Sequence, residues 1–315
     1  MLGRTANDLF WLARSIERAE NMARLTEVGY RLFLLPREGD GHNQEWQSTL
    51  ASAGCVDQYY AKYDKAEMAN VVNFLLFDET NPSSVQTCLA NARRNARAQR
   101  TAITRDMWES INTSWIEYSG FNPQRTSGTE LPKLLDWVKQ RSALYRGAML
   151  NTILRNDTYC FSQLGTFLER ADNTARILDV KYYVLLPSIG LVGSSVDNVQ
   201  WAAILRSVTA HRSYRWVYKE NYQPAHIAEF LILNPQMPRS LRSCYNEITT
   251  ALNDLGRFYG TTHACEIHAT ETAQQLAEST VQQIFSAGLH EFLLEFTGRN
   301  GWLASQVAEA YHFNG

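Results

Sequence analysis

The sequence predicts an all-α protein, an internally duplicated helical bundle with two pseudo-symmetric halves. Only eight prolines occur in 315 residues, and they fall in short breaks between long stretches rich in Ala, Leu, Arg, Glu and Gln. The alternation of apolar and polar residues that marks half-buried strands is scarce. The segment "SIERAENMAR" (15–24) also returns as "FLERADNTAR" (167–176), which predicts that one helical unit occurs twice.

Apolar periodicity and the residues that break it predict the helices along the chain. No Pro-rich or low-complexity linker divides the chain, so the helices are expected to pack as one globular unit. The expected helices cover residues 6–35, 43–63, 66–77, 83–113, 130–154, 157–186, 197–219, 224–233, 239–258 and 263–297, with a short one at 300–312. The expected loops are "PREGDGHN" (36–43), "SGFNPQRTSGTE" (119–130) and "PSIGLVGSSVDN" (187–198).

The internal repeat extends beyond the decapeptide and predicts the domain organisation. A shift of 152 residues brings 12–34 onto 164–186, with the Glu-Arg dipeptide and eight other positions identical. A shift of 155 places Trp46, Leu50, Ser52, Tyr59 and Tyr63 on identical residues, and a shift of 156 places "FLLFDETNPSSVQTC" (74–88) on "FLILNPQMPRSLRSC" (230–244). Three blocks in one order predict a tandem duplication, with a first helical repeat at 1–155 and a second at 156–315, packed about a pseudo-two-fold axis.

Composition limits the classes of function. A formal net charge of −2 argues against a protein that neutralises nucleic acid. No apolar run reaches membrane-spanning length, and "MLGRTANDLFWLAR" carries charges where a signal peptide needs an apolar block, so a soluble cytoplasmic protein is expected. Five scattered cysteines without CxxC spacing predict reduced, mostly buried thiols.

The repeated segment places a polar cluster on an otherwise apolar helix. Two acids, an asparagine and an arginine recur at i, i+3, i+4 and i+7 on one face, and apolar residues surround them on nearly every side, as in an interior helix. Buried charges of this kind need partners. The cluster comprises Glu17, Arg18, Glu20, Asn21 and Arg24 in the first copy and Glu169, Arg170, Asp172, Asn173 and Arg176 in the second.

Three interpretations of the cluster stay open. A self-satisfied ion-pair network would fix the register of the helices, and a polar site would bind a small cationic or amide-bearing ligand or a peptide. A carboxylate-bridged metal site is the third, but such bundle sites use Glu-x-x-His, which is absent here, so no metal or other cofactor is expected. If the two copies cross at the pseudo-axis, four carboxylates, two arginines and two asparagines would share one buried network.

Two further constellations are secondary candidates. "NARRNARAQRTAITR" places Arg93, Arg97 and Arg100 at i, i+4 and i+7 without a neighbouring acid, which is typical of a solvated face and also suits a docking surface or an anion site. His290 beside Glu291 could act as a general base or be an ordinary satisfied histidine. No Ser-His-Asp pattern and no Gly-rich phosphate loop is legible.

Several blocks resemble the alpha-E family, bacterial proteins named for an all-helical fold and a Glu-Arg motif. "MLGRTANDLFWLARSIERAENMARL" and "LGTFLERADNTARILDVKYY" are similar to its two signature helices, and "NARRNARAQRTAITRDMWESIN", "FLILNPQMPRSLRSC" and "GLHEFLLEF" are similar to further blocks. The resemblance runs from Met1 nearly to the C-terminus. One departure from internal symmetry is visible, because Ser83 in the first half matches Arg239 in the second.

The resemblance implies a role in peptide or amide-bond chemistry. Genes of the family lie beside those of circularly permuted ATP-grasp ligases, transglutaminase-like proteases and Ntn-hydrolase-like peptidases. The expected function is a non-catalytic partner or scaffold for an ATP-grasp-type ligase, with a transglutaminase-like protease as a further candidate partner. The alternative is an enzyme of the same pathway that uses the buried carboxylates for acid–base chemistry. A peptide ligand and a homodimer stay open; mutually paired, closed clusters would weaken the enzyme alternative.

Overall fold

A computed structural model describes the chain except residues 35–41, 127, 186–194, 220–221 and 314–315. Within the described residues the regular structure is helical throughout and contains no strand, which confirms the predicted all-α class. The first part comprises α1 (Gly3–Phe33), α2 (His42–Ala53), α3 (Val56–Tyr60), α4 (Met68–Leu76), α5 (Val85–Ala98), α6 (Arg105–Tyr118), the short 3-10 helix η1 (Pro123–Arg125) and α7 (Glu130–Thr152). The second comprises α8 (Asp157–Leu185), α9 (Ser195–Ser207), α10 (His211–Tyr218), α11 (Pro224–Ile232), α12 (Leu241–Tyr259), α13 (Ala264–Glu278), α14 (Val281–Ala287) and α15 (Leu289–Ala310).

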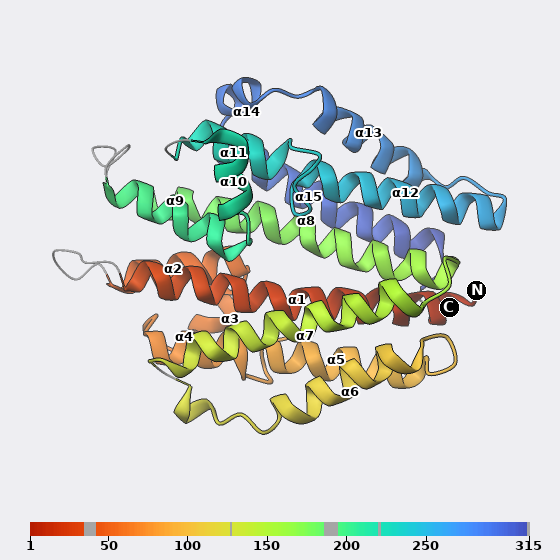
Figure 1. The fold of residues 1–315 in the computed structure, drawn as a ribbon, viewed down its shortest axis with the longest axis horizontal. Helices are drawn as coiled ribbons and strands as arrows, with labels where there is room; N and C mark the ends of the chain where they lie inside the picture. The colour runs from red at the N-terminus through yellow and green to blue at the C-terminus, as the bar shows by residue number, and fades with distance from the viewer. Residues whose placement is uncertain (35–41, 127, 186–194, 220–221, 314–315) are drawn as a thin grey trace.

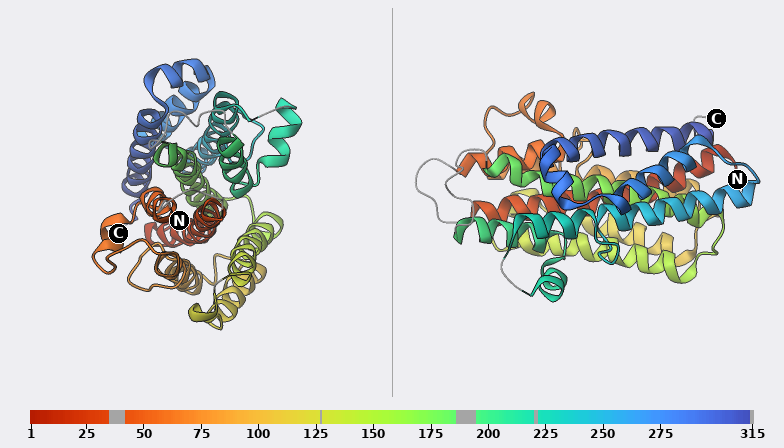
Figure 2. Two further views of the ribbon diagram at one scale, coloured as in Figure 1. Left: turned by 90° about the vertical axis from the view of Figure 1, so that its left-hand side faces the viewer. Right: turned by 90° about the horizontal axis from the view of Figure 1, so that it is seen from above.

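The helices α1 and α8 form the centre of the bundle and its most extensive helix pair (Figures 1 and 2). They run in the same direction, with α5 and α7 packed on α1 and with α12 and α15 packed on α8. Gly165 of α8 lies against the backbone of α1, because a Cβ atom there would come within 2.2 Å of the Phe10 carbonyl oxygen. This close approach brings the polar faces of both central helices within reach of each other.

Both central helices are buried over most of their surface, as the sequence predicts for interior helices. Leu9, Leu12 and Val28 of α1 and Leu164 and Leu168 of α8 are fully buried in one continuous core. Each such side chain contributes about 1.5–3 kcal/mol relative to exposure. Tertiary burial, more than helix propensity, therefore holds α1 and α8 in place.

Four of the expected helices are interrupted, and backbone turns explain two of the breaks. The expected helix 43–63 divides into α2 and α3 at Gly54, which has a φ of +68°. The expected helix 197–219 divides into α9 and α10 at Thr209, which has a φ of +58°. A positive φ ends a right-handed helix, and the threonine carries no sequence signal for it.

Capping residues explain the other two breaks. The expected helix 83–113 divides into α5 and α6. The side chain of Thr104 accepts a hydrogen bond from the Met107 N–H and so caps the start of α6. The expected helix 263–297 divides into three, with Thr280 capping α14 and Gly288, at a φ of +94°, preceding α15. The short helix expected at 300–312 is the second half of α15. The expected loops 36–43 and 187–198 lie largely outside the described residues.

Local geometry recurs at the repeated sequence blocks. Ser84 and Ser240 each cap the next helix by accepting a hydrogen bond from the N–H three residues later. Tyr59 and Tyr214 each stack on the tyrosine four residues along the chain. The same side chains thus make the same contacts in both parts at these positions, while the duplication itself and the boundaries 1–155 and 156–315 stay predictions.

Two composition-based expectations can be compared with the described residues. All five cysteines are free and buried, as predicted, and burial raises the pKa of the Cys88 and Cys244 thiols to about 12. Within the described part of the chain, no helix combines the length and the apolar character needed to cross a bilayer.

Candidate functional site

The two Glu-Arg dipeptides join α1 to α8 by reciprocal ion pairs. The carboxylate of Glu17 accepts hydrogen bonds from Nε and Nη2 of Arg170, both at 3.0 Å. The carboxylate of Glu169 accepts from Nε and Nη2 of Arg18 at 2.7 and 2.8 Å. Each glutamate therefore binds, through both its oxygens, the arginine that follows the other glutamate. Bidentate pairs of this kind are directional, so they set the register of the two helices.

A larger cluster surrounds the acids of α1; we call Glu17, Glu20, Arg24, Arg146, Arg170 and Arg239 the α1 cluster. Nη1 of Arg146, on α7, lies 2.8 Å from Oε2 of Glu17 and 2.5 Å from Oε2 of Glu20. Arg239, from the turn before α12, contacts both carboxylates, at 3.1 Å for Glu17. Four segments of the chain thus converge on two carboxylates.

Arg24 extends the α1 cluster toward the end of α9. Its Nε and Nη2 donate to Oε1 of Glu20 at 2.8 and 2.5 Å. Its Nη1 donates to the carbonyl oxygen of Ser207 and, at 3.0 Å, to Oγ1 of Thr209. The last carbonyls of a helix carry negative partial charge, which favours a cation there. Arg24 therefore links the central helix to the turn between α9 and α10.

Burial and ion pairing act in opposite directions on the α1 carboxylates. The side chains of Glu17 and Glu20 are 1% and 0% exposed. Burial alone would raise the pKa of Glu17, but Arg170, Arg146 and Arg239 outweigh it and hold the pKa below its usual value. Burial likewise opposes Arg239, Arg24 and Arg146 at Glu20, whose pKa is held well below its usual value. Both acids are therefore ionised at neutral pH and enclosed by guanidinium groups.

The α1 cluster carries more positive than negative charge. Two glutamates face four arginines, an excess of two positive charges among the described residues. The pKa of Arg239 is lowered to about 10, mainly by burial and also by repulsion from Arg24 and Arg170. The attraction of Glu20 and Glu17 acts in the opposite direction. An anion would therefore be attracted to this cluster and a cation repelled.

The acids of α8 form a second and more open cluster; we call Glu169, Asp172, Arg14, Arg18 and Arg176 the α8 cluster. Arg14 adds a 2.8 Å contact from Nε to Oε2 of Glu169. Burial alone would raise the pKa of Glu169, but Arg18 and Arg14 outweigh it and lower the pKa to about 2. Among the described residues the ion pair of Asp172 is with Arg176 of its own helix, at 2.6 Å, and these side chains are 21% and 36% exposed.

Asn21 and Asn173, the asparagines of the repeated segment, are both buried. Nδ2 of Asn21 donates to the carbonyl oxygen of Glu169 at 3.3 Å, which places it directly on the partner helix. The side-chain oxygens of Asn21 and Asn173 have no hydrogen-bond partner among the described residues. Asn21 therefore contacts the partner helix through the backbone of that helix and not through the ion pairs.

The expected single network is wrong in two respects. Within the described residues, no arginine forms ion pairs with an acid of α1 and an acid of α8 at once. The acids therefore form two separate clusters. Seven arginines, and not two, surround the four acids: Arg14, Arg18, Arg24, Arg146, Arg170, Arg176 and Arg239. Sequence reasoning missed Arg14, which precedes the repeated segment, and Arg146, on another helix. Only the packing of α7 on α1 brings Arg146 to the acids, so no local signal could have found it.

The second-half arginine that breaks the symmetry belongs to the site. Arg239 is 7% exposed and contacts both α1 acids. Its counterpart Ser83 donates its backbone N–H to Asn81 and has no part in the α8 cluster. The difference noted in the sequence therefore changes the charge of one cluster and not of the other.

Of the three arginines expected on one face, Arg93 and Arg97 lie on α5 and Arg100 lies beyond its end. Arg93 donates to Asn112 at 2.8 Å, linking α5 to α6. Arg97 is exposed in the last turn of α5, and Arg100 lies beyond the helix end with its guanidinium over the ring of Trp108, 4.4 Å from the centroid. Because α5 ends at Ala98, Arg100 does not continue the helical spacing.

His290 and Glu291 also separate. His290 on α15 lies 2.7 Å from Oδ1 of Asp179 on α8, whereas Glu291 is exposed and turns back toward Gly288. Burial raises the pKa of Asp179, against the contact with His290. The histidine therefore joins two packed helices, α15 and α8. Among the described residues, no group of three His, Cys, Asp or Glu side chains is arranged to hold a metal ion.

The fold and the site define a class of protein, all-helical chains in which reciprocal Glu-Arg pairs join two central helices. The chain belongs to the Alpha-E family, described as a predicted alpha-helical domain with a conserved ER motif, which matches residues 1–312. The reciprocal contacts explain why that motif is a dipeptide, since each helix must offer one acid and one arginine to the other.

Relatives among curated proteins are uncharacterized and longer. A protein of Mycobacterium bovis and one of Mycobacterium tuberculosis are each 31% identical to this chain over 118 residues, and another from Mycobacterium tuberculosis is 30% identical over 118 residues. Each match covers 33% of this chain and 13% of the relative. About a third of the chain therefore matches a small part of much longer proteins. No solved structure matches it.

Proposed function

We propose that this protein is a non-catalytic partner or scaffold for an ATP-grasp-type ligase, acting in the cytoplasm in a bacterial pathway of peptide synthesis or modification. A transglutaminase-like protease is a further candidate partner. The protein would hold the ligase or its peptide substrate and leave the bond-forming chemistry to the ligase. A rigid bundle with surface binding sites suits that task.

The observation that carries the proposal is the closure of the α1 carboxylates. A general acid or base needs a pKa near the working pH and a free position facing the substrate. Glu17 and Glu20 have pKa values below the usual range and are 1% and 0% exposed. Their oxygens already accept hydrogen bonds from four arginines. This arrangement supports a structural role for the acids and weakens the enzyme alternative.

The family and its relatives support a partner role. The relatives contain a segment similar to this chain within much longer sequences. A segment that is fused to further domains in one protein can, in another, be a separate chain that binds those domains as partners. The association of the alpha-E family with ATP-grasp ligases identifies the class of partner to test first.

Co-purification with the neighbouring ligase tests the proposal. The full-length chain and the ATP-grasp-type ligase encoded beside its gene would be co-expressed, then analysed by size-exclusion chromatography and by ligase turnover. We expect co-elution and a change in ligase turnover or product length, read by mass spectrometry. Separate elution with unchanged ligase products would contradict the proposal. The double variant Glu17→Gln, Glu20→Gln tests the enzyme alternative. If these residues perform acid–base chemistry, the variant should lose the activity of the pathway while it still binds the ligase.

The excess charge of the α1 cluster favours a second candidate function, the binding of a small carboxylate or phosphate anion. Arg146 is the entry point, since its side chain is 20% exposed while Glu17 and Glu20 are enclosed. Phosphate and glutarate should raise the melting temperature more than chloride at equal ionic strength, and the Arg146→Met variant should lose that difference. Equal shifts with all three anions would indicate screening alone.

A further inference from the structure

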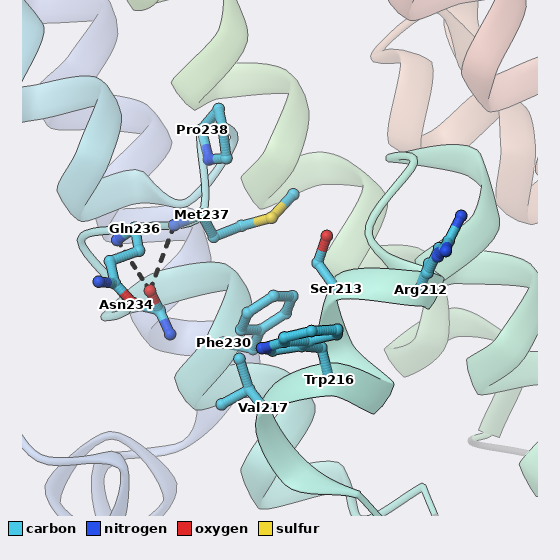
Figure 3. A pocket seen from close by; sticks show the side chains of 9 residues that line it. All are labelled: Arg212, Ser213, Trp216, Val217, Phe230, Asn234, Gln236, Met237 and Pro238. Atoms are coloured by element: carbon cyan, nitrogen blue, oxygen red, sulfur yellow. Dashed lines mark hydrogen bonds between the residues drawn. The ribbon is translucent and has the colours of Figure 1, made fainter.

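A pocket of about 300 Å³ lies between α10 and the turn that follows α11. Figure 3 shows the rings of Trp216 and Phe230 along one side, Met237 and Pro238 on the other, and Arg212 at one end. This volume is at the lower end for small-molecule sites. The pocket therefore has room for one or two side chains of a partner.

The corresponding corner of the first half carries an ion pair. There Lys62 Nζ pairs with Oδ2 of Asp78 at 2.5 Å across the end of α4. In the repeat alignment Lys62 matches Val217 and Asp78 matches Asn234. The side chain of Asn234 accepts hydrogen bonds from the backbone N–H groups of Gln236 and Met237, as that of Asp78 accepts one from the Thr80 N–H. The two corners therefore differ in the ion pair, whose place in the second corner is taken by an apolar residue and an amide.

Trp216 presents an unusually large apolar surface at this corner. Its side chain is 83% exposed, and the neighbouring Val217 is 46% exposed. The matching residue of the first half is Ala61. Both α3 and α10 stand out from the bundle, on opposite sides (Figure 2). Exposed tryptophan beside a pocket is characteristic of interface positions that contribute most to binding.

The charge around the pocket selects the kind of partner. Arg206, Arg212, Arg215 and Lys219 are exposed, and none has an ion-pair partner among the described residues. From residue 198 to residue 228 the sequence contains four arginine or lysine residues and one acid, Glu220. The first half has Asp57 where the second has Arg212. The corner is therefore strongly basic in a chain whose net charge is −2, and it complements an acidic surface.

We propose that this corner docks an acidic segment of a partner protein that inserts one aromatic or large aliphatic side chain between Trp216 and Met237. Carboxylates of the segment would lie against Arg212 and Arg215. The inference deepens the scaffold proposal and rests on it for the identity of the partner. The stated chemistry, an apolar anchor flanked by acids, is independent of that identity.

Fluorescence anisotropy with labelled heptapeptides tests the chemistry directly. The probe carries a central phenylalanine between six acidic residues; one control replaces phenylalanine by alanine and another replaces the acids by lysines. We expect saturable binding of the acidic phenylalanine peptide, weakened about tenfold or more in both controls and weakened by salt. The absence of saturable binding, or equal binding of all three peptides, would overturn the proposal.

Matched variants locate the binding. Trp216→Ala and Arg212→Glu should each reduce affinity for the acidic phenylalanine peptide by about tenfold or more. The controls are Trp302→Ala, a tryptophan of α15 that is 47% exposed, and Arg97→Glu, an exposed arginine of α5. Circular dichroism would show that each variant keeps its helix content. Unchanged affinity in Trp216→Ala would place the binding elsewhere.

The same variants separate this inference from the scaffold proposal. If the ligase co-elutes with the wild-type protein and equally with Trp216→Ala, the docking site is wrong while the scaffold role stands. If the acidic peptide binds at the corner but the ligase never co-elutes, the ligase is the wrong partner and the docking site stands. Loss of ligase binding in Trp216→Ala but not in Trp302→Ala would support both.

Discussion

The α1 and α8 clusters begin from the same sequence motif and end in different environments. In the α1 cluster two fully buried acids face four arginines from four segments. In the α8 cluster one acid is buried between Arg14 and Arg18, while the other pairs near the surface with Arg176. The repeated helix places the acids, but the segments packed around it decide burial and charge. The energetic consequences of equivalent residues should therefore differ.

The largest expected effect is the loss of a buried α1 acid. Glu20→Ala leaves Arg24, Arg146 and Arg239 without their shared carboxylate in a buried site, which should cost about 3–5 kcal/mol of the free energy of unfolding. The equivalent change Asp172→Ala, in a partly exposed pair, should cost less than about 1 kcal/mol. Denaturant unfolding of both variants measures the difference. Equal losses would show that the two clusters are energetically alike.

The next effect is a loss of stability in acid. The pKa of Glu169 is about 2 in the folded chain against 4.5 as the ordinary value, so the folded state binds fewer protons than the unfolded state between those values. The stabilisation, on the order of 3 kcal/mol, is complete above about pH 5 and declines as the pH falls toward 2. Glu17 and Glu20, whose pKa values are also lowered, act in the same direction.

Unfolding free energies measured between pH 7 and pH 2.5 check this dependence. The Glu169→Gln variant should be less stable at neutral pH and should lose less stability in acid than the wild-type protein. A variant with the same slope as the wild type would show that Glu169 is not responsible.

A smaller effect distinguishes the arginines of the two clusters. Arg18→Met leaves Glu169 with only Arg14 and should cost about 2 kcal/mol. Arg239→Met leaves each α1 acid with two other arginines and removes one excess charge, so it should cost less than about 1 kcal/mol although Arg239 is the more buried residue. Parallel urea titrations give the comparison. A larger loss in Arg239→Met would mean that contacts and not charge balance determine its contribution.

The smallest effect concerns the open pair of α8. Arg176→Ala should lower the free energy of unfolding by about 0.5 kcal/mol. The pair is an i,i+4 contact, and 36% of the arginine side chain is exposed. Added salt should reduce even this difference, since exposed charges are screened. Thermal unfolding at low and high salt provides the measurement. A loss of several kcal/mol that salt does not change would place Arg176 among the buried, essential partners.

Much of the fold could be predicted from the sequence, because helix formation depends on residues that are close together along the chain. The periodicity of α1 and α8 predicts interior helices, and the repeated block predicts where their acids lie. The helix breaks at Thr209 and Thr104 were not predicted, because the first depends on a backbone conformation that threonine rarely adopts and the second on a cap inside an otherwise helical pattern. The ion pairing of the acids follows only partly from arginines near them in sequence, such as Arg24 and Arg176, because Arg146 and Arg239 come from distant segments.

The sequence by itself determined the helical class, the two central helices and the repeated Glu-Arg dipeptide on each, since each depends on residues within a few turns of one another. Only the tertiary structure decided which arginines complete the clusters. Arg146 and Arg239 reach Glu17 across 129 and 222 residues of chain, and the open corner at Trp216 depends on the packing of α10 beside α11. Long-range packing sets burial and charge balance, and local periodicity carries no information about either.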